Sequence, residues 1–172
     1  VLFLTLRGWK ALNWPSMQAM IVNGLQQVAR EQAVLRESDR VDAEDRDMLR
    51  AMYRREAPFE SLKTALAMLL RMLEAHYGKK PILLLDEYDV PIQSAWEHDF
   101  YGEAIDFFRT FLTMALKTNP SLDFAVLTGV LRISKESIFS DLNNLSADSV
   151  LQMKYPTAFG FTPEEVQKLA ND

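Results

Sequence analysis

Two adjacent carboxylates, those of Asp86 and Glu87, follow directly after the apolar run Ile82 to Leu85. An aspartate in such a position can hold Mg²⁺, directly or through a water, because Mg²⁺ prefers few carboxylates and keeps much of its hydration shell. The glutamate that follows can polarise a water molecule for attack on a phosphate group. The pair therefore predicts magnesium-assisted phosphate chemistry. The alternative interpretation is a strand that ends in a solvated acidic turn.

The apolar run that carries this pair is expected to be a strand. Pro81 precedes it and charge begins where it ends, a pattern typical of a short strand that is buried on both faces of a parallel sheet. Ligands of an open α/β sheet bind outside the carboxyl ends of its strands, where Asp86 and Glu87 would emerge. Four apolar residues followed by Asp-Glu also form the Walker B pattern of P-loop ATPases of the additional-strand class.

A second polar strand end is predicted at Thr128. The run Phe124 to Leu127 is short and apolar and closes on Thr128 and Gly129, which indicates a third buried strand. In P-loop ATPases the strand beside the acidic one ends in a polar residue, called sensor 1, that reaches the γ-phosphate and the attacking water. The alternative is a threonine that caps an ordinary strand-to-loop turn.

The remaining periodic segments predict the elements that connect these strands. Val1 to Leu6 is apolar and β-prone and predicts another core strand. Apolar residues at helical spacing predict helices at about 17–35, 58–76 and 101–117, and the capping box Thr162 to Glu165 predicts a helix that begins at Pro163. Strands separated by helices require parallel crossovers, so we expect an α/β fold with helices flanking a parallel sheet.

Two segments are assigned no chemistry. Glu37 to Arg50 mixes both charge signs and is interpreted as a solvated loop or helix face, and Leu131 to Leu151 is interpreted as a loop with short helical turns. We count one domain over residues 1–172. It is expected to be incomplete, because the chain opens directly on a strand without an initiator Met or a basic leader, and because its last helix is cut off at Asp172.

The composition is that of an ordinary globular domain, with 48% apolar and 25% charged residues. A net charge of −5 offers no broad electrostatic footprint for nucleic acid or anionic lipid. The chain has no cysteine, which excludes disulfides and thiolate sites and favours a cytoplasmic location. No apolar run approaches the ~20 residues of a membrane span, so we expect no membrane partner.

Several longer segments resemble the predicted AAA-ATPase-like family. They are LLDEYDVPI (84–92), FAVLTGVLRISKESIFS (124–140), LNN (142–144) and FGFT (159–162), and together they extend over nearly the whole chain. That family is widespread in bacteria and often carries a nuclease-like domain after the ATPase. The resemblance implies an incomplete P-loop NTPase core of the additional-strand class, with ATP and Mg²⁺ as ligands of the complete domain.

The resemblance also implies roles for particular residues. Asp86 would be the magnesium ligand, Glu87 the catalytic base and Thr128 the polar sensor, while Arg132 and Lys135 would contact phosphate, in cis or across a subunit boundary. The alternative for Arg132 and Lys135 is that they are solvated loop side chains. Asp89 is expected to organise the turn after the strand rather than to bind metal.

One element of the family pattern is absent from the sequence. No Gly-x-x-x-x-Gly-Lys-Ser/Thr occurs in the 172 residues, although backbone N–H groups of such a loop supply most of the grip on the phosphates. We therefore expect this polypeptide alone to bind ATP weakly or not at all, to self-associate through exposed sheet surface, and to meet nucleic acid only through a domain outside the chain.

Two other functions remain open at this point. The first is a regulatory or interaction module that senses nucleotide or binds a partner without turnover. The second is a metal-dependent phosphodiesterase built on Asp86, Glu87 and Asp89, which would need carboxylates that converge from several elements.

Overall fold

The computed structural model describes residues 1–117, 119–130, 146 and 160–171. At its centre lies a parallel sheet of three strands in the order β1 (Leu2–Thr5), β2 (Ile82–Asp86) and β3 (Phe124–Leu127). Thr5 lies opposite Asp86 and Leu85 lies opposite Leu127, so the carboxyl ends of all three strands meet at one edge of the sheet. The predicted strands and their parallel arrangement are confirmed.

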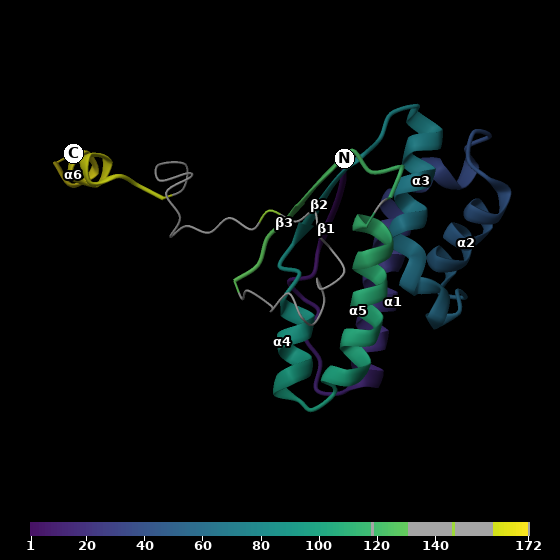
Figure 1. Ribbon diagram of the computed structural model, residues 1–172, viewed down its shortest axis with the longest axis horizontal. Helices are drawn as coiled ribbons and strands as arrows, with labels where there is room; N and C mark the ends of the chain where they lie inside the picture. Colours follow the sequence, from purple (N-terminus) through teal and green to yellow (C-terminus); the bar gives the residue numbers. More distant parts are fainter. Residues whose placement is uncertain (118, 131–145, 147–159, 172) are drawn as a thin grey trace.

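Helices make both connections between the strands. Between β1 and β2 the chain forms α1 (Trp14–Glu31), the 3₁₀ helix η1 (Ala33–Glu37), α2 (Ala43–Arg54), the 3₁₀ helix η2 (Phe59–Thr64) and α3 (Ala65–Tyr77). Between β2 and β3 it forms α4 (Val90–Glu97) and α5 (Tyr101–Leu116). Figure 1 shows α1, α3 and α5 on one side of the sheet, with α2 beyond them. The α/β class predicted from the sequence is therefore confirmed.

The first long helix begins and ends at recognisable signals. Asn13 Oδ1 accepts a hydrogen bond from the backbone N–H of Ser16 at 2.9 Å, and Pro15 occupies the first turn, where its missing N–H is not needed. The helix ends at Glu31, where the chain tightens into η1, so the predicted end near Leu35 was wrong. Leu35 is nevertheless buried, because η1 turns it into the core.

The predicted helix at 58–76 is in two parts. Its first turn is the 3₁₀ helix η2, and the α-helix α3 begins only at Ala65. Gly78 ends α3, in the left-handed conformation with φ 68° that glycine adopts without steric cost.

The core lies between one face of the sheet and the helices. Leu2, Leu4, Leu83 and Leu85 point into it from β1 and β2 and are at most 6% exposed. Phe107 of α5 stacks against other aromatic rings of this layer. Each such side chain contributes about 1.5–3 kcal/mol by leaving water, so this layer is the main reason the sheet edge has a fixed shape.

The opposite face of the sheet is open, which corrects the prediction of strands buried on both faces. Phe3, Phe124 and Val126 are 55%, 60% and 40% exposed, and Ile82 and Leu84 of the central strand are only half-buried. The reason is that α1, α3 and α5 all pack on the same side of the sheet (Figure 1). We call the residues Phe3, Ile82, Leu84, Phe124 and Val126 the open face.

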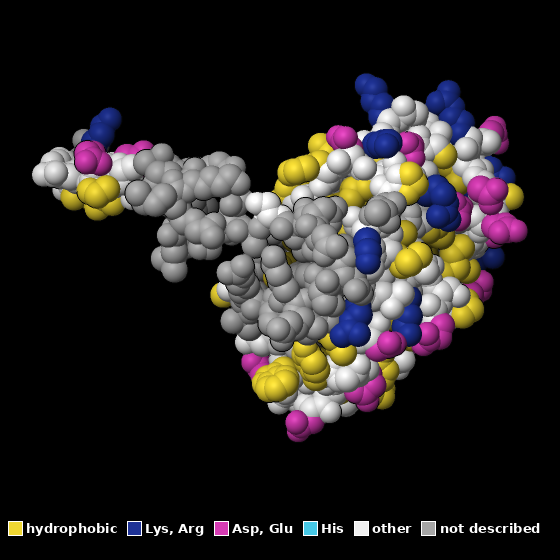
Figure 2. All heavy atoms as spheres, viewed as in Figure 1, with side chains coloured by type: hydrophobic (Ala, Val, Ile, Leu, Met, Phe, Trp, Pro, Cys, Tyr) yellow, Lys and Arg dark blue, Asp and Glu magenta, His cyan; other side chains and the backbone are white. Residues whose placement is uncertain are grey.

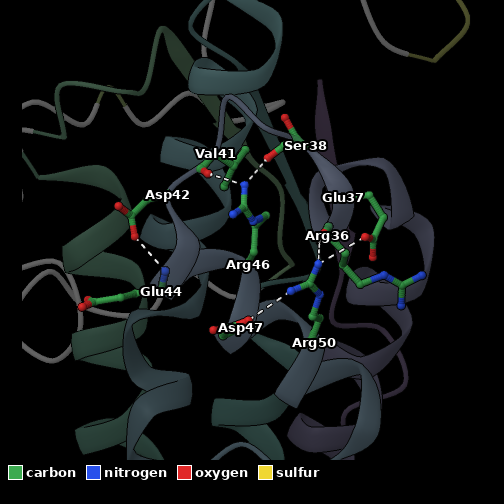
Figure 3. Close-up of polar contacts among 9 residues, drawn as sticks. All are labelled: Arg36, Glu37, Ser38, Val41, Asp42, Glu44, Arg46, Asp47 and Arg50. Carbon is green, nitrogen blue, oxygen red and sulfur yellow. Dashed lines mark hydrogen bonds and ion pairs between the residues drawn. The ribbon is translucent and has the colours of Figure 1, made fainter.

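The mixed-charge segment forms a helix held by arginine side chains, in keeping with the helix-face interpretation. Arg46 of α2 donates to the backbone oxygens of Ser38 at 2.6 Å and Val41 at 3.0 Å, and Arg50 donates to a backbone oxygen of η1 at 2.6 Å (Figure 3). These hydrogen bonds satisfy backbone carbonyls of η1 and of the turn that leads from it to α2. The two arginine side chains therefore stabilise the local structure of this segment. On the face drawn in Figure 2, acidic and basic side chains are interspersed over this helical part.

The last described helix, α6 (Pro163–Asn171), begins with the predicted capping box. Glu165 N donates to Thr162 Oγ1 at 3.3 Å, and Thr162 N donates to the Glu165 carboxylate at 2.7 Å. None of its residues is buried. The predicted loop at 131–151 lies outside the described residues apart from position 146. Within the described part of the chain, no helix has the length and apolar character needed to cross a membrane.

Candidate functional site

A row of three polar side chains lies across the carboxyl end of the sheet. Thr5 Oγ1 donates to Asp86 Oδ2 at 3.1 Å, and Thr128 Oγ1 donates to Asp86 Oδ1 at 2.6 Å. The aspartate, on the central strand, is thus held by the hydroxyl of Thr5 at the end of β1 and by that of Thr128 directly after β3. We call Thr5, Asp86 and Thr128 the polar row.

Strand alternation and register place this row. Leu83 and Leu85 point into the core, so Asp86 at the next position points to the other face of the sheet. The ladder continues just past the strands: Leu6 N donates to Asp86 O and Thr128 N donates to Leu85 O, both at 2.9 Å. These backbone bonds fix the spacing of the three side chains, so the row follows directly from the parallel pairing.

Glu87 lies beside the row in an unusual backbone conformation. Its φ is 53°, the left-handed region that residues with a β-carbon seldom adopt, and this turns the chain sharply after β2. Its carboxylate is 33% exposed and lies 3.8 Å from Arg7 Nε, whose side chain is 81% exposed. So exposed an ion pair contributes little to stability, and the Glu87 carboxylate remains accessible to water.

The turn after β2 is joined to the turn after β3. Tyr88 N donates to Thr128 O at 3.1 Å, and Asp89 Oδ2 accepts from Val130 N at 2.9 Å. Asp89 is 1% exposed and directly precedes α4. Its contacts agree with the expectation that it organises the turn, and they tie Thr128 to the start of α4.

The helix α4 was missed from the sequence, although a signal for it was present. Asp89 precedes it and Pro91 lies in its first turn, a combination common at helix starts. The serine of α4, Ser94, donates to Ala11 O and accepts from Ala11 N, both at 3.0 Å and both buried. The helix is thereby fixed to the segment that follows β1.

The polar row fits a magnesium ion that arrives with a phosphate ligand. Asp86 offers carboxylate oxygens, the hard donors that Mg²⁺ prefers, and Mg²⁺ commonly uses one or two carboxylates together with substrate phosphates. Among the described residues there is no group of three or more His, Cys, Asp or Glu side chains that could hold a metal. The convergent carboxylates that a two-metal phosphodiesterase needs are therefore not found in this part of the chain.

Sequence reasoning placed some of these residues and missed others. Asp86, Glu87 and Thr128 lie together as predicted, while Arg132 and Lys135 lie outside the described residues. Thr5 and Arg7 were missed. The signal for Thr5 was a hydroxyl at the very end of an apolar strand, the same position that Asp86 and Thr128 hold in their strands.

Comparison with known proteins agrees with the first two segments that carry the resemblance, 84–92 and nearly all of 124–140, while 142–144 and 159–162 lie outside the matched residues. A family model described as "Predicted AAA-ATPase" matches residues 1–139. A curated relative from Azotobacter chroococcum mcd 1, described as "Uncharacterized protein in vnfD 5'region", is 34% identical over 99 residues, which cover 57% of this chain and 19% of the relative. The match thus extends over about a fifth of that relative's length. No solved structure matches the chain.

Proposed function

The chain belongs to the predicted AAA-ATPase family, and from this premise we propose that it carries the magnesium-binding and water-activating part of a P-loop-type ATPase. ATP hydrolysis at this site would drive a conformational change. The observation that carries the proposal is the polar row: a central-strand aspartate held by hydroxyls of both neighbouring strands, with a glutamate next in sequence.

Each residue has a role that its position supports. Asp86 holds the metal through a carboxylate oxygen, directly or through a water. Glu87, partly exposed and turned sharply out of the strand, accepts a proton from the water that attacks the γ-phosphate. Thr128 donates its hydroxyl to the γ-phosphate or the attacking water. When bound, Mg²⁺ neutralises charge on the phosphates. Arg132 and Lys135 are proposed as phosphate contacts.

The proposal requires a phosphate-binding loop from outside residues 1–172, since these contain no Gly-x-x-x-x-Gly-Lys-Ser/Thr. Backbone N–H groups of such a loop provide most of the binding of the phosphates. The 1–172 polypeptide alone is therefore expected to bind Mg-ATP weakly or not at all, and a calorimetric titration with micromolar affinity would contradict this.

The test uses a longer native polypeptide that includes residues 1–172. Phosphate release from Mg-ATP is measured for the wild type, for Glu87→Gln and for Glu97→Gln, an exposed acid at the end of α4 that serves as control. We expect Glu87→Gln to reduce hydrolysis by at least ~100-fold while ATP binding persists, because the general base is lost. Equal hydrolysis by Glu87→Gln and Glu97→Gln would refute the proposed role of Glu87.

A second candidate is a nucleotide-sensing or protein-interaction module without turnover. The same assay separates the two. Nucleotide binding by the longer protein without any phosphate release would favour the module, and release that depends on Glu87 would favour the ATPase.

A further inference from the structure

The two hydroxyls of the polar row have only one proton each to donate. In this structure both protons go to Asp86, the Thr5 proton to Oδ2 and the Thr128 proton to Oδ1. A threonine hydroxyl can accept further hydrogen bonds but cannot donate a second one. Each contact with Asp86 therefore uses the whole donor capacity of its threonine.

This limit matters for Thr128 when nucleotide is bound. Non-bridging phosphate oxygens are acceptors, so Thr128 can donate to the γ-phosphate only if it releases Asp86 Oδ1. The aspartate would then keep one of its two hydroxyl donors. Under the proposed function, the orientation of its carboxylate at that moment depends on Thr5.

The surroundings of Thr5 suit this task. Arg7 N donates to Thr5 Oγ1 at 3.3 Å, which occupies an acceptor position of the hydroxyl and favours the rotamer whose proton points to Asp86. The backbone around Thr5 is fixed as well, because Thr5 lies in register with Asp86 and Leu6 N donates to Asp86 O at 2.9 Å. The donor and the acceptor are thus held by the same ladder.

We propose that Thr5 is a positioning residue that keeps the Asp86 carboxylate oriented for the metal while Thr128 donates to the nucleotide. This inference rests on the proposed function. It assigns different roles to two threonines that make similar contacts in the structure: Thr5 stays on the aspartate, and Thr128 alternates between the aspartate and the ligand.

The test measures metal binding directly, with Mn²⁺ as a paramagnetic probe in place of Mg²⁺. The longer native protein is titrated with Mn²⁺ in the presence of a non-hydrolysable ATP analogue, free Mn²⁺ is followed by electron paramagnetic resonance, and a titration of the analogue alone is subtracted to give the Mn²⁺ bound by the protein. Thr5→Val removes the hydroxyl and keeps the shape, Thr5→Ser keeps the hydroxyl, and Thr110→Val removes a hydroxyl that donates to the Asp106 carbonyl of its own helix.

We expect Thr5→Val to weaken Mn²⁺ binding about tenfold, because a hydrogen bond to a charged group is lost. Thr5→Ser and Thr110→Val should stay within about twofold of the wild type. Binding of the analogue without metal, measured in a chelating buffer, should be unchanged in all variants, which a general loss of structure would not permit. If Thr5→Val lowers the melting temperature, Thr5→Ala provides a second variant without the hydroxyl.

The outcomes distinguish this inference from the proposed function. If Asp86→Asn abolishes Mn²⁺ binding but Thr5→Val binds like Thr5→Ser, the role of Thr5 is refuted and the function of Asp86 stands. If Asp86→Asn binds Mn²⁺ like the wild type, the metal site itself is refuted, and the role of Thr5 with it.

Discussion

Asp89 and Gly129 lie so close together that a β-carbon on Gly129 would come within 2.7 Å of Asp89 Oδ1. This contact joins the turn after β2 to the turn after β3, next to the hydrogen bond from Val130 N to Asp89. The site therefore depends on a glycine that has room for no larger side chain unless the aspartate moves.

The first prediction concerns this pair. Gly129→Ala should destabilise the protein by about 1–3 kcal/mol, because its methyl group displaces the buried Asp89 carboxylate. Asp89→Ala should cost a similar amount by leaving Val130 N without this acceptor. Since both changes disrupt one contact, the double variant should lose clearly less stability than the sum of the two single losses. Urea unfolding of the wild type, the two single variants and the double variant would measure this. Additive losses would show that the contact does not couple the two turns.

The second prediction concerns the backbone of Glu87. Its φ of 53° costs a residue with a β-carbon about 1–2 kcal/mol relative to glycine. Glu87→Gly should therefore be more stable than Glu87→Ala by about 1 kcal/mol, although both lack the carboxylate. Arg55, at the end of α2, has a similar φ of 64°. The matched control compares the stability of Arg55→Gly with that of Arg55→Ala. Equal melting temperatures for the two Glu87 variants would contradict the strained conformation.

The third prediction compares two helical glycines. Gly24 of α1 packs under the Trp9 ring, where a β-carbon would clash with Trp9 Cζ2, while no described residue lies within 4 Å of the corresponding position at Gly102 of α5. Gly24→Ala should destabilise by about 1–3 kcal/mol despite the better helix propensity of alanine. Gly102→Ala should be neutral or stabilise by up to about 1 kcal/mol. Thermal unfolding of both variants tests this, and a stabilised Gly24→Ala would contradict the packing of Trp9.

The fourth prediction concerns acid unfolding. Lys63 Nζ lies 2.8 Å from a carboxylate oxygen of Glu60 and 2.8 Å from one of Asp106. The hydrogen bond from Lys63 lowers the pKa of Asp106. The hydrogen bonds to Asp106 and Glu60 raise the pKa of Lys63. The contribution of Asp106 to the free energy of unfolding is therefore present above the ordinary carboxyl pKa of about 3.9. It is lost as the pH falls through the lowered pKa of Asp106. The Lys63 contribution to the free energy of unfolding is present below the ordinary lysine pKa of about 10.4 and is lost as the pH rises through its raised value.

Lys63→Met removes both contributions. Its melting temperature should be slightly below that of the wild type between about pH 5 and pH 9, and the difference should shrink below about pH 4. Because Asp106 is 70% exposed, the difference should also decrease in high salt. A difference that does not depend on pH would show that this ion pair makes no titratable contribution.

The fifth prediction concerns the open face. Phe3, Phe124 and Val126 form exposed apolar surface on the sheet, so the 1–172 polypeptide should self-associate at micromolar concentrations. Replacing Phe3 and Phe124 together by serine should shift it toward monomer in sedimentation velocity. Trp96→Ser, at an aromatic residue that is 72% exposed on α4, is the control and should change little. A wild-type chain that is already monomeric would refute this prediction.

The parts of the site that sequence could predict are those with local signals. Asp86 and Thr128 each close an apolar run, so their strands and their common edge could be predicted without coordinates. The strand-end signal at Thr5 was weaker, because apolar Leu6 continues the run past it, and the contact of Thr5 with Asp86 follows only from the register of β1 against β2. The exposure of Phe124 was likewise hidden, since a β-branched apolar run looks the same whether helices cover one face of a sheet or both.

The position of α2 has a practical consequence for following the protein at work. Figure 1 shows α2 beyond α1 and α3 as seen from the sheet, and the backbone N–H of its exposed Glu44 donates to the Asp42 cap. Because residues 1–172 contain no cysteine, Glu44→Cys would place one thiol in this part of the protein for attaching a fluorescent dye. Such a reporter would signal any shift of the helical layer when nucleotide is added, while leaving the polar row untouched.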